Sequence, residues 1–153
     1  MKFDLSKVEF SKNDLRNKIT LPSEMSLELA ELIGIHAGDG FMNYYVRPGK
    51  RDYIIVYSGD SRDDYEYHVT YIAGLYMKLF NKKVTHGLRV KHEIQTYVRS
   101  KAILTFLNRV CDLPLGKKQD LTIPNAVSEA GDDFVKAFIR GLADTDFSLC
   151  FKK

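Results

Sequence analysis

The sequence predicts an α+β fold with an antiparallel four-stranded sheet, and two observations predict it. Apolar residues recur at helical spacing in long segments that begin near residues 23, 61 and 101. Between these segments lie paired stretches of alternating or β-branched residues, and a short turn joins each pair. The order helix, strand, strand, helix, strand, strand, helix therefore places consecutive strands side by side as antiparallel hairpins.

The first segments of the chain predict an arm followed by a long apolar helix. Residues 1–22 are polar and mixed in composition, and we expect a partly helical N-terminal arm. Ser23 or Ser26 caps the first long helix, which ends at Gly40.

The later elements follow from the same two patterns. Ile94, Thr96 and Val98 alternate with more polar or aromatic residues, which predicts a strand with one apolar face. The expected elements are strands at 41–46 and 53–58, a helix with cap candidates at 61–64 that runs to about 80, strands at 83–90 and 93–99, a helix at 101–111, a loop at 113–120, a short helix after Pro124 and a last helix from Asp132 or Asp133 to Asp146.

Composition limits the protein class. The 153 residues, 44% hydrophobic and 28% charged, suit one globular domain with a buried core. No apolar run approaches the ~18 residues that span a bilayer, and the start of the chain lacks the apolar core of a signal peptide, so we expect an intracellular protein without membrane contact. Cys111 and Cys150 lack the spacing of a zinc site, and we expect both to be small buried hydrophobic residues.

One segment occurs twice in the chain, as Leu32–Gly40 and as Ile139–Phe147. In each copy an apolar helix ends with an aspartate, Asp39 or Asp146, and 107 residues separate the two. A helix C-terminus repels a carboxylate by about 0.3–1 kcal/mol unless a cation joins it. The repetition therefore predicts a shared cation site.

Small residues recur at every fourth position of both helices. Glycine inside a helix costs about 0.5–1 kcal/mol relative to alanine, and close approach of two backbones is a reason to keep it. Two such helices packed in parallel bring Asp39 and Asp146 together, where their oxygens suit a hard divalent cation such as Mg²⁺. The expected helix-interface residues are Ala30, Gly34, Gly38, Ala137, Gly141 and Thr145.

The distribution of charge favours phosphate binding. Net charge is only +3, but residues 82–118 carry nine basic residues against two acidic ones. A solvated lysine-rich surface is the alternative reading of this segment. Metal ions beneath a basic sheet suit in-line hydrolysis of a phosphodiester. His36 is expected to pack in the core, and Asp144 stays outside the primary site.

The two repeated segments resemble the LAGLIDADG motif of homing endonucleases, and the order of elements resembles that family's αββαββα core. The resemblance implies a site-specific, metal-dependent endonuclease acting on double-stranded DNA, with Asp39 and Asp146 as catalytic acids and metal ligands. It also implies a basic residue in the later loop, at Lys118 or at Lys117 beside it. Ala37 replaces an acid of the motif and Phe147 replaces its final glycine.

DNA contacts are expected from the polar face of the sheet. Arginine and glutamine on strands read base edges, whereas lysines mostly contact the backbone. The candidates are Tyr44, Arg47, Lys50, Arg51, Tyr53, Arg89, Lys91, Gln95, Tyr97 and Arg99. For the tyrosines, packing on the sheet is an equal alternative.

By this reading, residues 23–130 form one unit, and residues 131–153 form a second motif helix and the start of a truncated second unit. Three explanations stay open: a split enzyme completed by a second polypeptide, a homodimer, or a relic that no longer cuts. Two other functions also stay open, a non-cleaving nucleic-acid-binding module such as a maturase or DNA-binding regulator, and a protein whose motif helices serve only as an interface.

Overall fold

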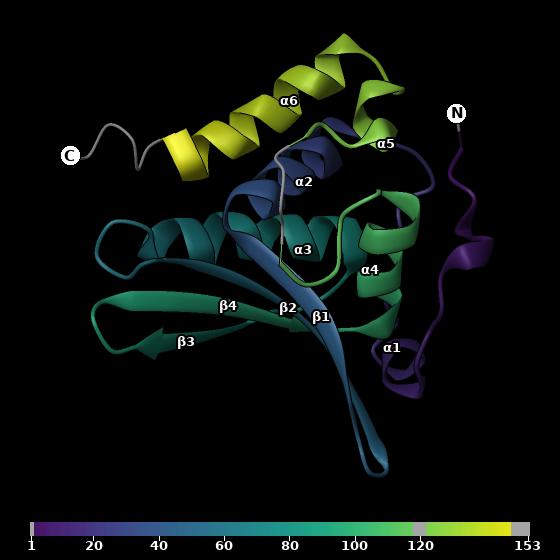
Figure 1. The fold of residues 1–153 in the computed structure, drawn as a ribbon, viewed down its shortest axis with the longest axis horizontal. Helices are drawn as coiled ribbons and strands as arrows, with labels where there is room; N and C mark the ends of the chain where they lie inside the picture. Colours follow the sequence, from purple (N-terminus) through teal and green to yellow (C-terminus); the bar gives the residue numbers. More distant parts are fainter. Residues whose placement is uncertain (1, 118–121, 148–153) are drawn as a thin grey trace.

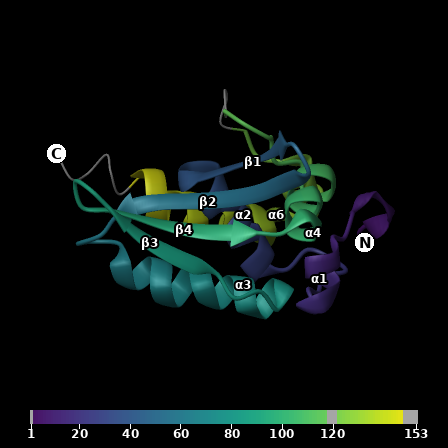
Figure 2. The same cartoon turned by 90° about the horizontal axis from the view of Figure 1, so that it is seen from below.

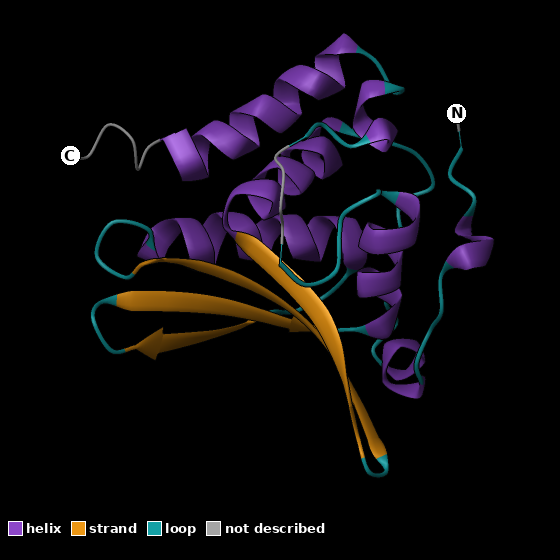
Figure 3. Ribbon diagram, viewed as in Figure 1, coloured by secondary structure: helices purple, strands orange, loops and turns teal. Residues whose placement is uncertain are grey.

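The computed structural model describes residues 2–117 and 122–147, and of Asp146 and Phe147 it describes only the backbone. Its four strands form one antiparallel sheet with the order β1-β2-β4-β3 (Figures 1 and 3). The strands are β1 (Gly40–Arg47), β2 (Lys50–Asp60), β3 (Thr85–Arg89) and β4 (Glu93–Arg99). The predicted α+β class and its four-stranded antiparallel sheet are confirmed.

The β1–β2 hairpin is longer than the sequence predicted. Pairing runs from Gly40 opposite Tyr57 to Arg47 opposite Lys50, so only Pro48 and Gly49 remain for the turn. Gly49 has φ +75°, a conformation that glycine adopts without strain. The hairpin therefore projects beyond the body of the protein (Figure 1).

Helices cover one face of the sheet and leave the other open (Figure 2). Within the described residues, two α-helices continue into π-helical segments and a third follows one, and these segments and one 3₁₀ turn are labelled η. The elements are η1 (Leu5–Lys7), α1 (Lys12–Arg16), α2 (Leu27–Asp39), η2 (Tyr67–Ile72), α3 (Ala73–Phe80), α4 (Lys101–Thr105), η3 (Phe106–Val110), α5 (Asn125–Ser128), α6 (Asp132–Leu142) and η4 (Ala143–Phe147).

The helix begins at Tyr65, directly after the predicted cap candidates at 61–64, because β2 continues to Asp60 and a turn follows it. Two carboxylates hold this turn. Asp64 accepts from the Asp60 backbone N–H at 2.9 Å, and Asp60 accepts from the Arg62 N–H at 2.8 Å. Such side-chain bonds to nearby backbone groups favour a turn over a helix.

The core lies between the sheet and the helices, and α2 runs through its centre. From Leu29 to Ala37 every residue of α2 is buried, which includes His36 at 1% exposure, as expected. Aromatic rings fill the space beside α2, and Tyr76 and Phe106 both pack against Phe80. Cys111 is buried as predicted, whereas Cys150 lies outside the described residues. None of the helices in the described part of the chain has the length and apolar character needed to cross a membrane.

Candidate nucleic-acid interface and cleavage centre

Helices α2 and α6 pack against each other at glycines. A methyl group on Gly34 would overlap the carbonyl oxygen of Phe138 and lie 3.0 Å from the nitrogen of Leu142. A methyl group on Gly141 would overlap the carbonyl oxygen of Glu31 in the same way. Because both obstacles are backbone atoms, these positions hold the two helices at a separation that only glycine permits.

This packing is parallel and has twofold character. Gly34 lies against Phe138, and Gly141 lies against Glu31. The two copies of the repeat are offset by 107 residues, so Gly34 corresponds to Gly141 and Glu31 corresponds to Phe138. The two contacts are therefore equivalent. One turn further along, Gly38 lies against the side chain of Thr145. Ala30 and Ala137, the remaining small residues of the ladder, are buried.

The two helices consequently end on the same side of the molecule. Asp39 is the last residue of α2 and is half-buried. The backbone of Asp146 lies in η4, which continues α6. The twofold relation places these two positions as equivalents across the axis between the helices.

A hydrogen-bonded aromatic cluster fixes the end of α2. The Tyr57 and Tyr76 hydroxyls lie 2.6 Å apart, and the Tyr57 hydroxyl lies 3.4 Å from His36 Nδ1. The His36 ring also lies against Gly40, where a methyl group would overlap it. Burial raises the pKa of Tyr57 and Tyr76 above their usual range, so both phenols stay neutral.

Two tyrosines that the sequence analysis did not single out lie close to the acidic residues Glu31 and Asp144. Tyr67 and Tyr71 of η2 stack with their ring centroids 5.3 Å apart. Burial, and then the charges of Asp144 and Glu31, raise the pKa of Tyr67, with a smaller contribution from Asp39. Within the described residues the buried Tyr67 hydroxyl has no hydrogen-bond partner. Their spacing of four residues on a helix was the available signal, because it puts both rings on one face.

The described residues do not form a closed metal site, since no three of their His, Cys, Asp and Glu side chains converge in a metal-binding arrangement. An open site is compatible with this finding, because Mg²⁺ commonly binds one or two carboxylates together with substrate phosphates. Carboxylate oxygens such as those of Asp39 are of the hard type that such a cation prefers. Lys118 and the side chain of Asp146 lie outside the described residues, Lys117 is exposed, and Asp144 is exposed on η4.

The strand register decides which predicted DNA-contact residues share the open face. Ile94, Thr96 and Val98 are buried beneath the sheet, so the alternate residues of β4 point away from the helices. Residues paired across neighbouring strands point to the same face of the sheet. Arg89 of β3 pairs with Glu93, and Ile54 of β2 pairs with Arg99, so Arg89 and Ile54 also lie on the open face. Six of the ten candidates share the open face: Arg47, Lys50, Arg89, Gln95, Tyr97 and Arg99.

Three other candidates lie on the helix side, contrary to the expectation of one shared face. Side chains at every second position of a strand point to the same face of the sheet. The face that holds the buried Met42 and Ile55 therefore also holds Tyr44, Arg51 and Tyr53. Tyr44 stacks on Tyr53 with a centroid separation of 5.7 Å. Lys91, the tenth candidate, lies in the β3–β4 turn with φ +62°.

Arginine side chains on the open face form hydrogen bonds and cation–π contacts with Tyr97. Arg89 Nε donates to the Tyr97 hydroxyl at 2.9 Å and to Gln95 Oε1 at 3.2 Å. The guanidinium groups of Arg89 and Arg99 lie 5.5 and 6.0 Å from the centre of the Tyr97 ring. Arg99 also pairs with Asp52 at 3.4 Å. The face therefore carries arginine and aromatic side chains that can contact nucleic acid, together with the carboxylates of Asp52, Asp60 and Glu93.

Comparison with known proteins shows similarity at the level of structure. Neither the protein-family models nor the curated proteins give a match to this sequence. Among solved structures, mesophilic variants of the homing endonuclease I-DmoI match with a TM-score of 0.55 and 16% identity over 78% of this chain. An I-DmoI variant in complex with its target DNA and in the presence of manganese matches with a TM-score of 0.56 and 18% identity over 80% of this chain.

The chain spans only part of these relatives, 60% and 62% of the two I-DmoI chains. A weaker match, with a TM-score of 0.41, joins 60% of this chain to 30% of the LAGLIDADG meganuclease I-AabMI, at 14% identity. The likeness to I-DmoI shows that this chain has a homing-endonuclease fold, as the resemblance of the repeated motif implied.

Proposed function

We propose that the protein is a site-specific endonuclease that hydrolyses phosphodiester bonds of double-stranded DNA. One observation supports this above all: the glycine-packed pair α2 and α6 ends beside the sheet with an aspartate at both symmetry-related positions. A pair of helices used only as an interface would not need a carboxylate at each negatively polarised end.

The open face of the sheet binds the duplex in this proposal. A β-sheet surface enters the major groove, where arginine and glutamine recognise base edges and lysine contacts phosphates. The bonds that Arg89 makes to Gln95 and Tyr97 hold these side chains ready for base contact. The duplex is thereby oriented with one phosphodiester over the ends of α2 and α6.

Asp39 and Asp146 would hold a divalent cation such as Mg²⁺ at these helix ends. When bound, the cation polarises the phosphoryl oxygen and lowers the pKa of an attacking water. Asp39 supplies its ligand from a fixed helix end, because the His36 and Tyr57 contacts restrain the last turn of α2. Lys118 is the proposed basic residue that neutralises charge developing on the phosphate.

Cleavage after target selection tests this function. Duplexes that the protein retains from a random 30-bp library are incubated with Mg²⁺, Mn²⁺ or Ca²⁺, and nicked and linear products are separated. We expect Asp39→Asn to lower the cleavage rate about 10³-fold, because metal-assisted stabilisation of the transition state contributes several kcal/mol. Asp133→Asn is the matched control, since Asp133 is exposed at the opposite end of α6. Equal rates for Asp39→Asn and the wild type would remove Asp39 from the mechanism.

A non-cleaving nucleic-acid-binding module is the second candidate. The open face of the sheet supports it, because side chains such as Arg89, Gln95 and Tyr97 can contact a duplex without a metal. Retained binding in EDTA, together with no nicking in any of the three metals, would support this function. If cleavage appears only when a second polypeptide or a second copy is added, the chain supplies one half of a two-lobed enzyme.

A further inference from the structure

The sheet has an open corner where β4 ends and β2 continues. Arg99 opposite Ile54 is the last pair between β4 and β2, so residues 50–53 of β2 pair with β1 alone among the described strands. The chain leaves β4 at Ser100 and enters α4 there. The projecting hairpin and α1 lie on either side of this corner (Figure 1).

A basic groove of about 710 Å³ occupies the corner. Five cationic side chains line it, together with one carboxylate, Asp52, which already pairs with Arg99. The cations come from both sides of the sheet: Arg47, Lys50 and Arg99 from the open face, Arg51 and Lys101 from the helix side. The groove thus runs from the open face around the free end of β2.

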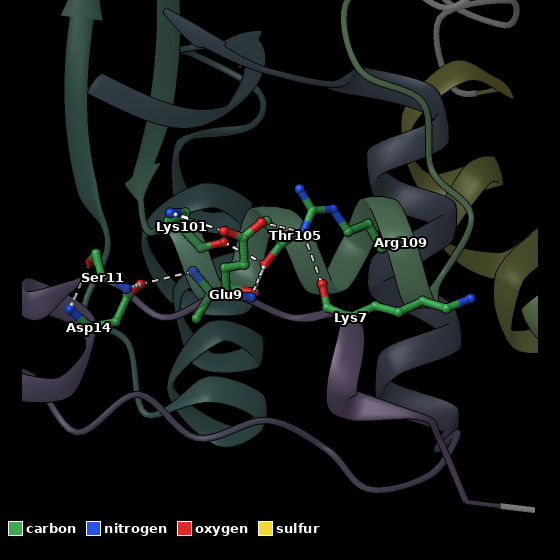
Figure 4. A network of polar contacts seen from close by, with 8 residues as sticks. Lys7, Glu9, Ser11, Asp14, Lys101, Thr105 and Arg109 are labelled. Carbon is green, nitrogen blue, oxygen red and sulfur yellow. Dashed lines mark hydrogen bonds and ion pairs between the residues drawn. The ribbon is translucent and has the colours of Figure 1, made fainter. Parts of the chain in front are cut away.

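The N-terminal arm forms the far wall of this groove through Ser11 and Asn13. Asp14, which is 2% exposed, holds the arm in place by accepting hydrogen bonds from the Ser100 hydroxyl at 2.6 Å and the Ala102 N–H at 2.8 Å. Asp14 and Ser11 also cap each other at the start of α1. Lys101 is held at 3.3 Å from Glu9 in the same network (Figure 4). The wall is therefore built by long-range contacts.

We propose that this groove binds a phosphate of the DNA backbone at the outer end of the contacted duplex, with the N-terminal arm as one side of the clamp. The proposal rests on the proposed function and extends the DNA contact beyond the open face. The groove is much larger than a single phosphate and is continuous with the open face through Arg47, Lys50 and Arg99. A nucleic-acid strand that passes through it fits this shape better than a free anion does.

The salt dependence of duplex binding tests the clamp. Each neutralised phosphate contributes a slope of about −0.9 to log K against log salt. Arg51 lies on the helix side, so a duplex restricted to the open face would not touch it. We expect Arg51→Gln to make the slope shallower by about 0.9 on a random-sequence 30-bp duplex. Lys136→Gln removes one positive charge from an exposed position of α6, away from the groove, and should leave the slope unchanged.

A second pair of variants probes the arm. Asn13→Asp places a carboxylate in the groove and should weaken duplex binding about 3- to 10-fold at 0.1 M salt, as expected for a charge within one Debye length of a phosphate. Asn125→Asp makes the same change at an exposed position of α5, which lies away from α1 and the projecting hairpin (Figure 1), and should be neutral.

Two results would overturn the clamp while leaving the proposed function intact. One is an unchanged slope in Arg51→Gln. The other is saturation of the Asn13 side-chain amide signal by inorganic phosphate alone, which would identify a free-anion pocket. Failure of the wild type to bind duplex would overturn both proposals, whereas loss of cleavage with binding intact would affect only the proposed function.

Discussion

The glycine contacts between α2 and α6 make a sharp prediction for Gly34→Ala. The added methyl group would overlap the carbonyl oxygen of Phe138 and lie 3.0 Å from two further backbone atoms, whereas carbon atoms pack at about 3.5–4.0 Å. A backbone oxygen cannot rotate away, so the helices must separate by about 1 Å. Overpacking of this kind costs about 1–3 kcal/mol, and alanine regains about 0.5–1 kcal/mol of helix propensity.

We therefore expect the free energy of unfolding to fall by about 1–2 kcal/mol in Gly34→Ala. Urea denaturation followed by circular dichroism measures this change, and the melting temperature should fall by about 2–8 °C. Gly74→Ala is the matched control, because Gly74 lies in α3 and a methyl group there meets no atom within 4 Å. That variant should be more stable than the wild type by about 0.5–1 kcal/mol.

The twofold relation adds a second requirement. Gly141→Ala should cost about as much as Gly34→Ala, because the same contact is repeated on the other helix. The double variant should lose less free energy of unfolding than the sum of the losses in the two single variants, because the first methyl group already separates the helices. Equal stability of Gly34→Ala and Gly74→Ala would refute the close packing of α2 and α6.

Three further predictions follow from the described contacts. Asp14→Ala should lower the free energy of unfolding by about 2–4 kcal/mol in urea titrations, because it leaves the buried Ser100 hydroxyl and Ala102 N–H without their acceptor. Burial lowers the pKa of His68, Asp64 opposes this shift, and His86 adds to it. Below about pH 6.5 the unfolded chain therefore binds more protons than the folded chain does. Stability measured from pH 8 to 5 should therefore fall as the pH drops below this value, and the fall should be smaller in His68→Gln. Tenfold Mg²⁺ over its Kd should raise the stability of the wild type by about 1.4 kcal/mol, and calorimetry should detect no such rise in Asp39→Asn.

Local patterns were sufficient to predict the order of elements. The alternation of Ile94, Thr96 and Val98 was enough to place β4, because those side chains are buried beneath the sheet. The start of the helix after β2 was also predicted, and carboxylate bonds from Asp60 and Asp64 hold the turn that precedes it.

The side of the sheet on which a residue lies was harder to predict. Tyr44 and Arg51 have the polar character of the open face, but strand parity groups them with Met42 and Ile55. Alternate residues of a strand point to opposite faces of the sheet, and the sequence of β1 and β2 does not reveal which alternate set packs against the helices. The role of Asp14 was unpredictable for a different reason, because its partners lie 86 and 88 residues away along the chain.

The two copies of the repeat are similar on one helix face and differ on the other. On the helix faces that meet, Ala30 and Gly34 recur 107 residues later as Ala137 and Gly141. On the opposite side, Leu29 and Ile33 of α2 are buried in the core, whereas the equivalent Lys136 and Arg140 of α6 are exposed. A sheet packed against α6 as β1 and β2 pack against α2 would bury both cations, which is costly without partners. What the two copies share is thus the paired helix face and its terminal aspartate, the features that the proposed cleavage centre needs, whereas the outward face of α6 combines these two cations with the exposed Ile139.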